Sequence, residues 1–214
     1  MKFCLRLLLL ALLIGSPVTS LGHSVWIEPV ESQLVVRFAE PDGKYEKSPG
    51  HLDSLTLPVV FFAVGTNAPV IVDAPKKADH FLVLGVTPTN LVCAESTFTV
   101  RGGRKPMFYA RWQPAGLVAA TPLTTLDLVP TGNAGEVRIC LRGQPVPNVK
   151  ATLRTPDEKE SELVADADGL VRFTPTQSGQ YLLTVAHQRE PIAGFHGGRA
   201  YKETSHNAAL TWKQ

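Results

Sequence analysis

Two segments near the carboxyl end decide the fold of this chain: GQYLLTVAH at 179–187 and HNAALTW at 206–212. Both are short runs rich in apolar, β-branched and aromatic residues, which is typical of β-strands. Similar runs recur along the 214 residues, separated by clusters drawn from 17 Gly and 17 Pro. No longer segment shows apolar residues at helical period. The pattern predicts an all-β fold, most simply two β-sandwiches, with strands at 24–30, 33–38, 58–64, 69–72, 80–84, 97–101, 107–112, 124–129, 136–141, 149–154, 161–165, 170–173, 180–187 and 206–212.

The last two strands are predicted to pair in one antiparallel register. It places Tyr181 opposite Trp212, Leu183 opposite Leu210 and Val185 opposite Ala208. These residues then form one continuous apolar stripe that suits a sandwich core. A slip by one residue would turn the stripe away from the core, so burial selects this register.

Histidines gather at the open end of this predicted hairpin. One further step of the ladder sets His187 opposite His206, with their Cβ atoms about 5 Å apart, and two imidazoles at that spacing can share a Cu, Ni or Zn ion. His196 lies in the Gly-rich loop between them and can fold back. We therefore expect His187, His206 and His196 to bind metal. The alternative is a neutral pair bonded to backbone groups at the sandwich rim, and His51 and His80 are expected to be solvated.

The amino-terminal residues 1–22 are typical of a secretory signal peptide. A basic start precedes a short apolar run, and Ser20 and Gly22 stand three and one positions before a cut that would free His23. A free His23 offers its α-amine and its imidazole, which both lose a proton near neutral pH and can bind a transition metal. The alternative is a cut elsewhere, for instance after Ser20. Export predicts a periplasmic or secreted protein, and the apolar run is shorter than the roughly 20 residues of a membrane span.

The remaining chain is expected to form two domains. Pro130, Thr131, Gly132 and the polar residues after them are the best linker candidate. The prediction is a signal peptide at 1–22, an amino-terminal β-sandwich domain at 23–132 and a second β-sandwich domain at 133–214.

Charge and cysteine content restrict the possible partners. The chain has 21 Lys and Arg against 19 Asp and Glu, and loss of Lys2 and Arg6 with the signal leaves 19 against 19. A net charge of zero without a basic block makes nucleic acid and anionic lipid poor partners. Cys93 and Cys140 either pair in an oxidising compartment or stay as buried free thiols, and the sequence leaves both open.

Three motifs of the second domain carry a family resemblance: GQPVPNV at 143–149, ADADG at 165–169 and GQYL at 179–182. They resemble the transthyretin-like, carboxypeptidase-regulatory-like β-sandwich group. This resemblance implies a fold and leaves the function open, because such folds host many roles.

A second resemblance covers both ends of the predicted mature chain. HSVWIEP at 23–29 and VAH at 185–187 are similar to a family of exported bacterial proteins of unknown function, often labelled a nickel-uptake substrate-specific component. The resemblance implies functional roles for His23, Trp26, Glu28 and His187. Ser24 stands where an acidic residue is common in that family.

These observations favour a non-enzymatic protein that captures or delivers Ni, Co or Cu through His23, His187, His206 and His196. A membrane metal transporter is the partner that this role implies. One alternative is a structural or adhesive two-sandwich protein without metal, and another is a copper oxygenase with a histidine brace. The sequence contains no nucleophile elbow, phosphate loop or His-Glu-x-x-His helix, which speaks against a hydrolase.

Overall fold

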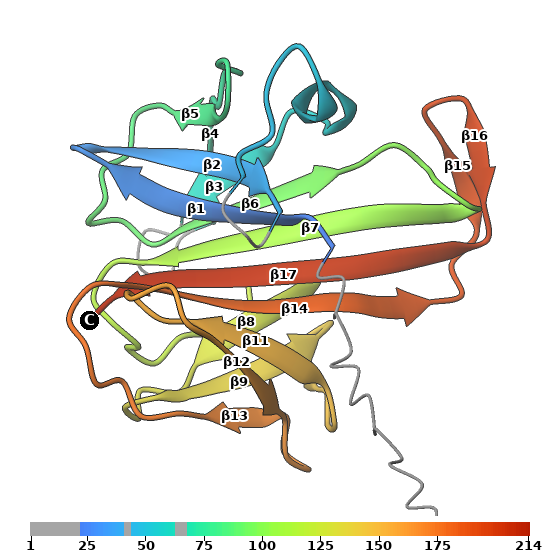
Figure 1. Ribbon diagram of the computed structural model, residues 1–214. Coiled ribbons are helices and arrows are strands. Elements are labelled where there is room, and N and C mark those ends of the chain that lie inside the picture. The colour runs from blue at the N-terminus through green and yellow to red at the C-terminus, as the bar shows by residue number, and fades with distance from the viewer. Residues whose placement is uncertain (1–21, 41–43, 63–67) are drawn as a thin grey trace, which may run out of the picture.

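The computed structural model describes residues 22–40, 44–62 and 68–214, so the predicted signal peptide up to residue 21 lies outside the described residues. Within these ranges the chain is all-β, which confirms the predicted fold class (Figure 1). The described helical structure is a single 3-10 turn, η1 (His51–Ser54). No described helix is long and apolar enough to cross a membrane.

An eight-stranded sheet forms the centre of the molecule (Figure 1). Neighbouring strands are antiparallel except β7 and β17, which run parallel from Arg104 beside Glu203 to Gln113 beside Trp212. The strand order is β12 (Glu160–Val164), β11 (Lys150–Arg154), β14 (Gln180–Glu190), β17 (Glu203–Lys213), β7 (Arg104–Gln113), β6 (Val92–Thr97), β3 (Val59–Phe62) and β4 (Val70–Val72).

A three-stranded sheet covers one face of this central sheet. It consists of β1 (Ser24–Val30), β2 (Gln33–Ala39) and β5 (Phe81–Val83), in that order. Successive side chains of a strand point to opposite faces, and Phe108 and Trp112 of β7 point towards this layer. The core between the two layers buries aromatic and aliphatic side chains, among them Ile27, Val36, Phe38, Phe81 and Ala110.

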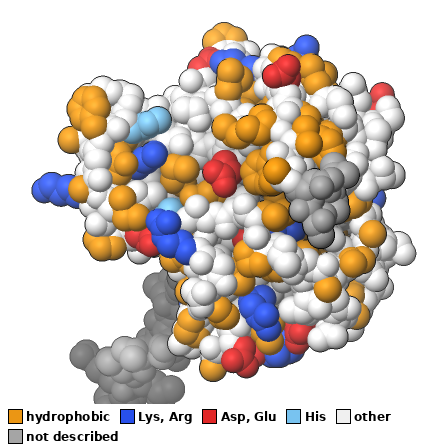
Figure 2. Space-filling view, turned by 180° about the vertical axis from the view of Figure 1, so that it is seen from behind, with side chains coloured by type: hydrophobic (Ala, Val, Ile, Leu, Met, Phe, Trp, Pro, Cys, Tyr) orange, Lys and Arg blue, Asp and Glu red, His pale blue; other side chains and the backbone are white. Residues whose placement is uncertain are grey.

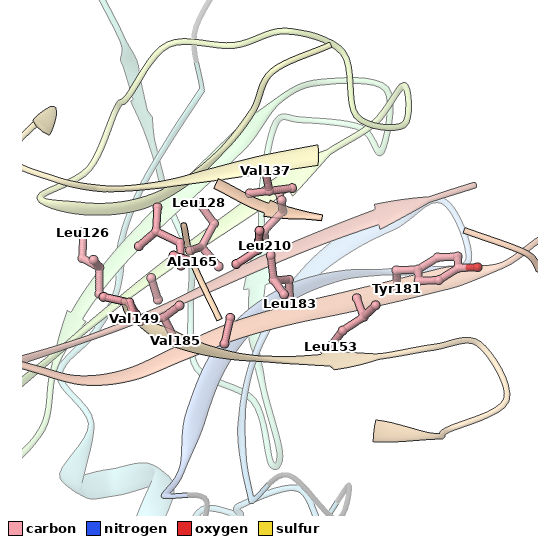
Figure 3. Close-up of a cluster of buried hydrophobic side chains, with 14 of the residues drawn as sticks. Leu126, Leu128, Val137, Val149, Leu153, Ala165, Tyr181, Leu183, Val185 and Leu210 are labelled. Atoms are coloured by element: carbon pink, nitrogen blue, oxygen red, sulfur yellow. The ribbon is translucent and has the colours of Figure 1, made fainter. Parts of the chain in front are cut away.

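A second layer covers the opposite face. It contains β8 (Leu126–Pro130), β9 (Glu136–Leu141), β13 (Leu170–Arg172) and β10 (Gln144–Pro145). Tyr109 of β7 and Leu210 of β17 point into this core, which Figure 3 shows closed by leucine and valine side chains from β8, β11 and β14. The strand β7 therefore contributes to both cores, one on each face, whereas β17 contributes to the second core and packs Ala209 against Trp26 and Ala39 on its other face.

The segment predicted to be a linker between domains lies within a β-hairpin. Residues 131–135 connect β8 to β9, and these strands pair with each other, with Pro130 opposite Val137. The segment is thus a hairpin turn. The central sheet also continues across the predicted boundary, because β7 pairs with β17; the division at 132 and 133 stays a prediction.

One predicted strand is wrong, and one expected loop contains strands. The strand expected at 97–101 overlaps the observed strand at Thr97 alone, because β6 spans Val92–Thr97 and the backbone N–H of Thr99 bonds to Ser54 and not to β7. In the Gly-rich loop, β15 (Gly194–His196) and β16 (Arg199–Tyr201) form a separate two-stranded sheet.

The predicted hairpin register is confirmed over most of its length. Tyr181 pairs with Trp212, Leu183 with Leu210 and Val185 with Ala208, as predicted. The ladder then shifts between Val185 and Gln188, so that His206 stands opposite Gln188.

The predicted pairing of His187 with His206 is therefore wrong. His187 has a φ of 59°, and its backbone N–H donates to Asn207 Oδ1 at 3.1 Å. The side chain of Asn207 also donates to the carbonyl of Met107 at 3.1 Å. This side chain closes a β-bulge, in which an extra residue changes the register of everything beyond it.

Both cysteines of the described chain are free and buried. Burial raises the pKa of the Cys93 thiol to about 12, which keeps it protonated and unreactive. Of the two alternatives that the sequence left open, the structure shows the buried thiols.

Candidate metal centre

Three potential metal ligands converge at the start of β1. His23, Glu46 and His51 each bring one ligand atom, and these atoms lie within 4.8 Å of one another. His23 Nε2 lies 2.5 Å from Glu46 Oε1, and His51 Nδ1 lies 3.3 Å from the same oxygen. This group, called the histidine cluster below, is the one set of three or more His, Cys, Asp or Glu found at such spacing among the described residues.

Each member is positioned by local backbone contacts. His23 directly precedes β1, and its ring stacks on Phe38 with 4.9 Å between centroids. The backbone N–H of Glu46 donates to the carbonyl of Phe38 at 2.9 Å, which holds the loop against the end of β2. His51 begins η1, where Asp53 accepts the backbone N–H of Gly50 at 3.0 Å.

The cluster is partly open to solvent. The side chains of His23, Glu46 and His51 are 28%, 20% and 55% exposed. Partial burial raises the pKa of Glu46, but hydrogen bonds with His23 and His51 outweigh it and leave the pKa below its usual range. A second carboxylate is near, since Glu40 Oε1 lies 4.0 Å from His23 Nε2. The arrangement offers two imidazoles and an ionised carboxylate at an accessible surface.

His187 lies close to the chain just before His23. Its Nε2 is 3.3 Å from the position that a Cβ atom would take on Gly22. Burial and the neighbouring Arg104 and Arg189 lower the pKa of His187, so its imidazole is neutral at pH 7. The structure therefore brings His187 beside Gly22, the residue before His23, although it does not pair His187 with His206.

His206 is buried, with a potential partner close to each ring nitrogen. Its Nδ1 lies 2.9 Å from the Tyr109 hydroxyl, and its Nε2 lies 2.9 Å from Glu190 Oε2. Arg142 in turn donates to Glu190. With 3% of the residue exposed, His206 would have to give up one of these partners in order to bind an ion.

The remaining histidines lie in other surroundings. His196 lines a cleft of about 240 Å³ together with Asp53, Thr99 and other residues of η1 and the segment after β6. His80 lies next to β5, and its Nδ1 is 2.7 Å from Asp79 Oδ1.

Trp26 and Glu28 belong to a hydrogen-bonded network on β1 and β2. Trp26 Nε1 donates to Glu28 Oε2 at 2.8 Å, and Arg37 Nε donates to Glu28 Oε1 at 2.8 Å. The Tyr45 hydroxyl donates to the same Oε1 at 3.4 Å, and the Arg37 guanidinium lies 4.2 Å from the Tyr45 ring centre. All four side chains are thus joined in one network, and Trp26, Glu28 and Arg37 lie on the face of β1 and β2 opposite to Ile27 and Val36.

Sequence reasoning identified His23 but missed Glu46 and His51. Both belong to the polar stretch 39–57, and His51 was expected to be solvated. Its ring is indeed more than half exposed, yet it also contacts Glu46 and lies 5.8 Å from the His23 ring. The available signal was a Glu and a His five residues apart in a polar loop, together with a predicted terminal His.

The fold and the cluster together define an all-β protein with a partly exposed histidine and carboxylate centre at the rim of its first layer. By sequence, the chain belongs to the family described as Domain of unknown function (DUF4198), which matches residues 60–189. This match includes His80 and His187 and begins after the histidine cluster. No curated protein matches the chain.

Proposed function

We propose that this protein binds a transition metal ion at the histidine cluster and serves in metal capture or delivery. The observation that carries the proposal is the convergence of His23 Nε2, His51 Nδ1 and Glu46 Oε1 within 4.8 Å. Neutral imidazole and carboxylate are ligands that Ni, Co, Cu and Zn accept, and intrinsic affinity favours Cu among them.

The spacing of the cluster fits an ion after a small adjustment. Bonds of about 2.0–2.2 Å place neighbouring ligand atoms roughly 3–3.5 Å apart. His51 and Glu46 already stand at 3.3 Å, whereas His23 and Glu46, at 2.5 Å, must separate slightly. Because half of the His51 side chain is exposed, an ion could enter and leave without unfolding, which suits a cargo better than a permanently enclosed cofactor.

A second donor set becomes possible if the predicted cut after Gly22 occurs. It would turn the amide nitrogen of His23 into an α-amine, next to the neutral imidazole of His187. The amine and the His23 ring could then chelate an ion together with His187. This set uses the same His23 ring, so the two sets either compete for one ion or share the ring through its two nitrogens.

Localisation and partner belong to the same proposal. A secretory signal peptide at 1–22 would place the protein in the periplasm or outside the cell, where a membrane metal transporter would receive the ion. The resemblance to nickel-uptake proteins supports nickel as one cargo, and the motifs of residues 133–214 support a transthyretin-like second domain. We propose no enzymatic step at this cluster.

Calorimetry and native mass spectrometry test the proposal on protein that begins at His23. We expect one Cu, Ni, Co or Zn ion per chain, and His51→Ala or Glu46→Gln should weaken binding by about tenfold or more, since 1.4 kcal/mol of lost ligation is already tenfold. His80→Ala is the matched control: His80 contacts a carboxylate as His51 does, but lies outside the cluster.

The outcomes separate the possible sites. If both cluster variants bind as the wild type does while His187→Ala does not, the ion lies on the α-amine and His187. Keeping Gly22 on the chain should then abolish binding as well, because it converts the amine to an amide. If the wild type holds no ion, the metal function is refuted and a structural or adhesive role is favoured.

A further inference from the structure

Residues 191–202 form an arm that projects beyond the body of the protein. The arm contains β15 and β16 and lies past the ends of β14 and β17 (Figure 1). The arm is held at both ends: at its base the backbone N–H of Lys202 donates to Gly103 at 2.7 Å, and beside its turn Arg199 Nη1 donates to Val100 at 3.4 Å. The arm is therefore a built element with a defined orientation.

The outward face of the arm is apolar, whereas the outward face of an ordinary surface hairpin is polar. His196 and Arg199 are paired on the inner face, where His196 lines the cleft towards the body. Phe195 and Ala200 are paired on the outer face, and Phe195 is 72% exposed. Ile192, at the base, is 40% exposed. The apolar side thus faces solvent, and on the other side His196 lines the cleft while Arg199 stays exposed.

Charge on the arm has one sign. Residues 191–202 contain Arg199 and Lys202 and no Asp or Glu. The carboxylates that flank the arm are already paired, Glu190 with Arg142 and Glu203 with Arg104. Figure 2 shows apolar and basic side chains side by side on this projecting part. The overall charge balance of the chain conceals this local basic excess.

We infer that the arm docks the protein onto an anionic phospholipid surface, with Phe195 entering the interface and Arg199 and Lys202 near the headgroups. An apolar tip flanked by cations matches the apolar boundary and negative charge of such a bilayer. A stable protein interface needs about 800 Å² per partner, whereas a Phe ring supplies at most about 250 Å². The small convex tip therefore fits a bilayer better than a protein.

Vesicle co-sedimentation tests this inference without any metal. We expect binding to vesicles of phosphatidylglycerol and phosphatidylethanolamine, weaker binding to phosphatidylcholine, and a decline as salt rises. Phe195→Ser should lower partitioning by about tenfold, the effect of losing one buried aromatic side chain. Arg199→Gln with Lys202→Gln should lower it on the anionic vesicles alone. Ile71→Ser, at a β4 position that is 71% exposed, is the matched control and should bind as the wild type does.

A fluorescent reporter gives an independent readout. The native Trp26, Trp112 and Trp212 are at most 3% exposed, so Phe195→Trp adds a solvent-exposed indole whose emission should shift to the blue on anionic vesicles. Wild-type protein that stays in the supernatant, or Phe195→Ser that binds equally well, would overturn the inference. Self-association that Phe195→Ser removes, without vesicle binding, would assign the arm to a second copy of this chain instead.

Discussion

Replacement of Asp127 by Asn should destabilise the protein severely. Asp127 and Arg111 form an ion pair between β8 and β7, with side chains that are 2% and 1% exposed. Arg111 Nε lies 2.9 Å from Oδ1 and Nη2 lies 2.6 Å from Oδ2. The backbone N–H of Leu123 also donates to Oδ2, at 2.7 Å. This carboxylate therefore neutralises a buried cation and binds the second layer to the central sheet.

The expected cost follows from that burial. Removing one partner leaves an uncompensated buried charge, which costs about 3–5 kcal/mol, and Asn also turns an NH₂ group towards existing donors. For a chain of this size such a loss corresponds to a fall in Tm of about 6 to 20 °C. Urea unfolding at pH 7, followed by the fluorescence of the buried Trp112 and Trp212, measures it.

Two further variants make the measurement decisive. Glu162→Gln breaks a pair of similar length, 2.9 Å to Lys150, whose side chains are 49% and 71% exposed; it should change stability by at most about 1 kcal/mol. Arg111→Met combined with Asp127→Leu removes both charges and should recover most of the loss. A cost below about 1 kcal/mol for Asp127→Asn would refute the argument that this pair is electrostatically isolated from water.

Two more predictions concern the hairpin of β14 and β17. Leu183→Ala should cost about 2–5 kcal/mol in urea unfolding, because Leu183 is fully buried between Leu153 and Leu210; an unchanged midpoint would contradict the observed core. Burial lowers the pKa of His206, and the raising effect of Glu190 offsets this only in part. The unfolded chain therefore binds the proton more readily, so stability should fall as the pH drops through about 6.5. His206→Gln should flatten that dependence between pH 7.5 and 5, and an unchanged slope would assign it to other groups.

Local patterns predict local structure well in this chain. The strand expected at 24–30 coincides with β1, and the apolar stripe of Leu183 and Val185 predicts the true register of the last hairpin. The prediction fails at His187 because a bulge adds one residue without changing the apolar composition on either side. Periodicity has no signal for that insertion, which depends on the side chain of Asn207 filling the gap.

The long-range arrangement of the strands could not be predicted from the sequence. β7 and β17 are parallel neighbours, although about 100 residues separate Arg104 from Glu203, and nothing in either segment specifies the other as its partner. The same limit applies to the histidine cluster. His23 could be predicted because a signal peptide would expose it, whereas Glu46 and His51 depend on the path of a polar loop that only tertiary contacts define.

The hydrogen bonds of Glu28 give a physical reason for the presence of the residues that carry the family resemblance. Glu28 accepts hydrogen bonds from Trp26 on β1, from Arg37 on β2 and from Tyr45 in the loop. Tyr45 directly precedes Glu46, while Trp26 is three residues from His23, so one buried carboxylate fixes both segments that supply the cluster. Such buried networks hold a single arrangement when every member is satisfied. In the proposed metal site Glu28 is accordingly expected to act as a positioning residue, which holds the segments of His23 and Glu46 without being a ligand itself.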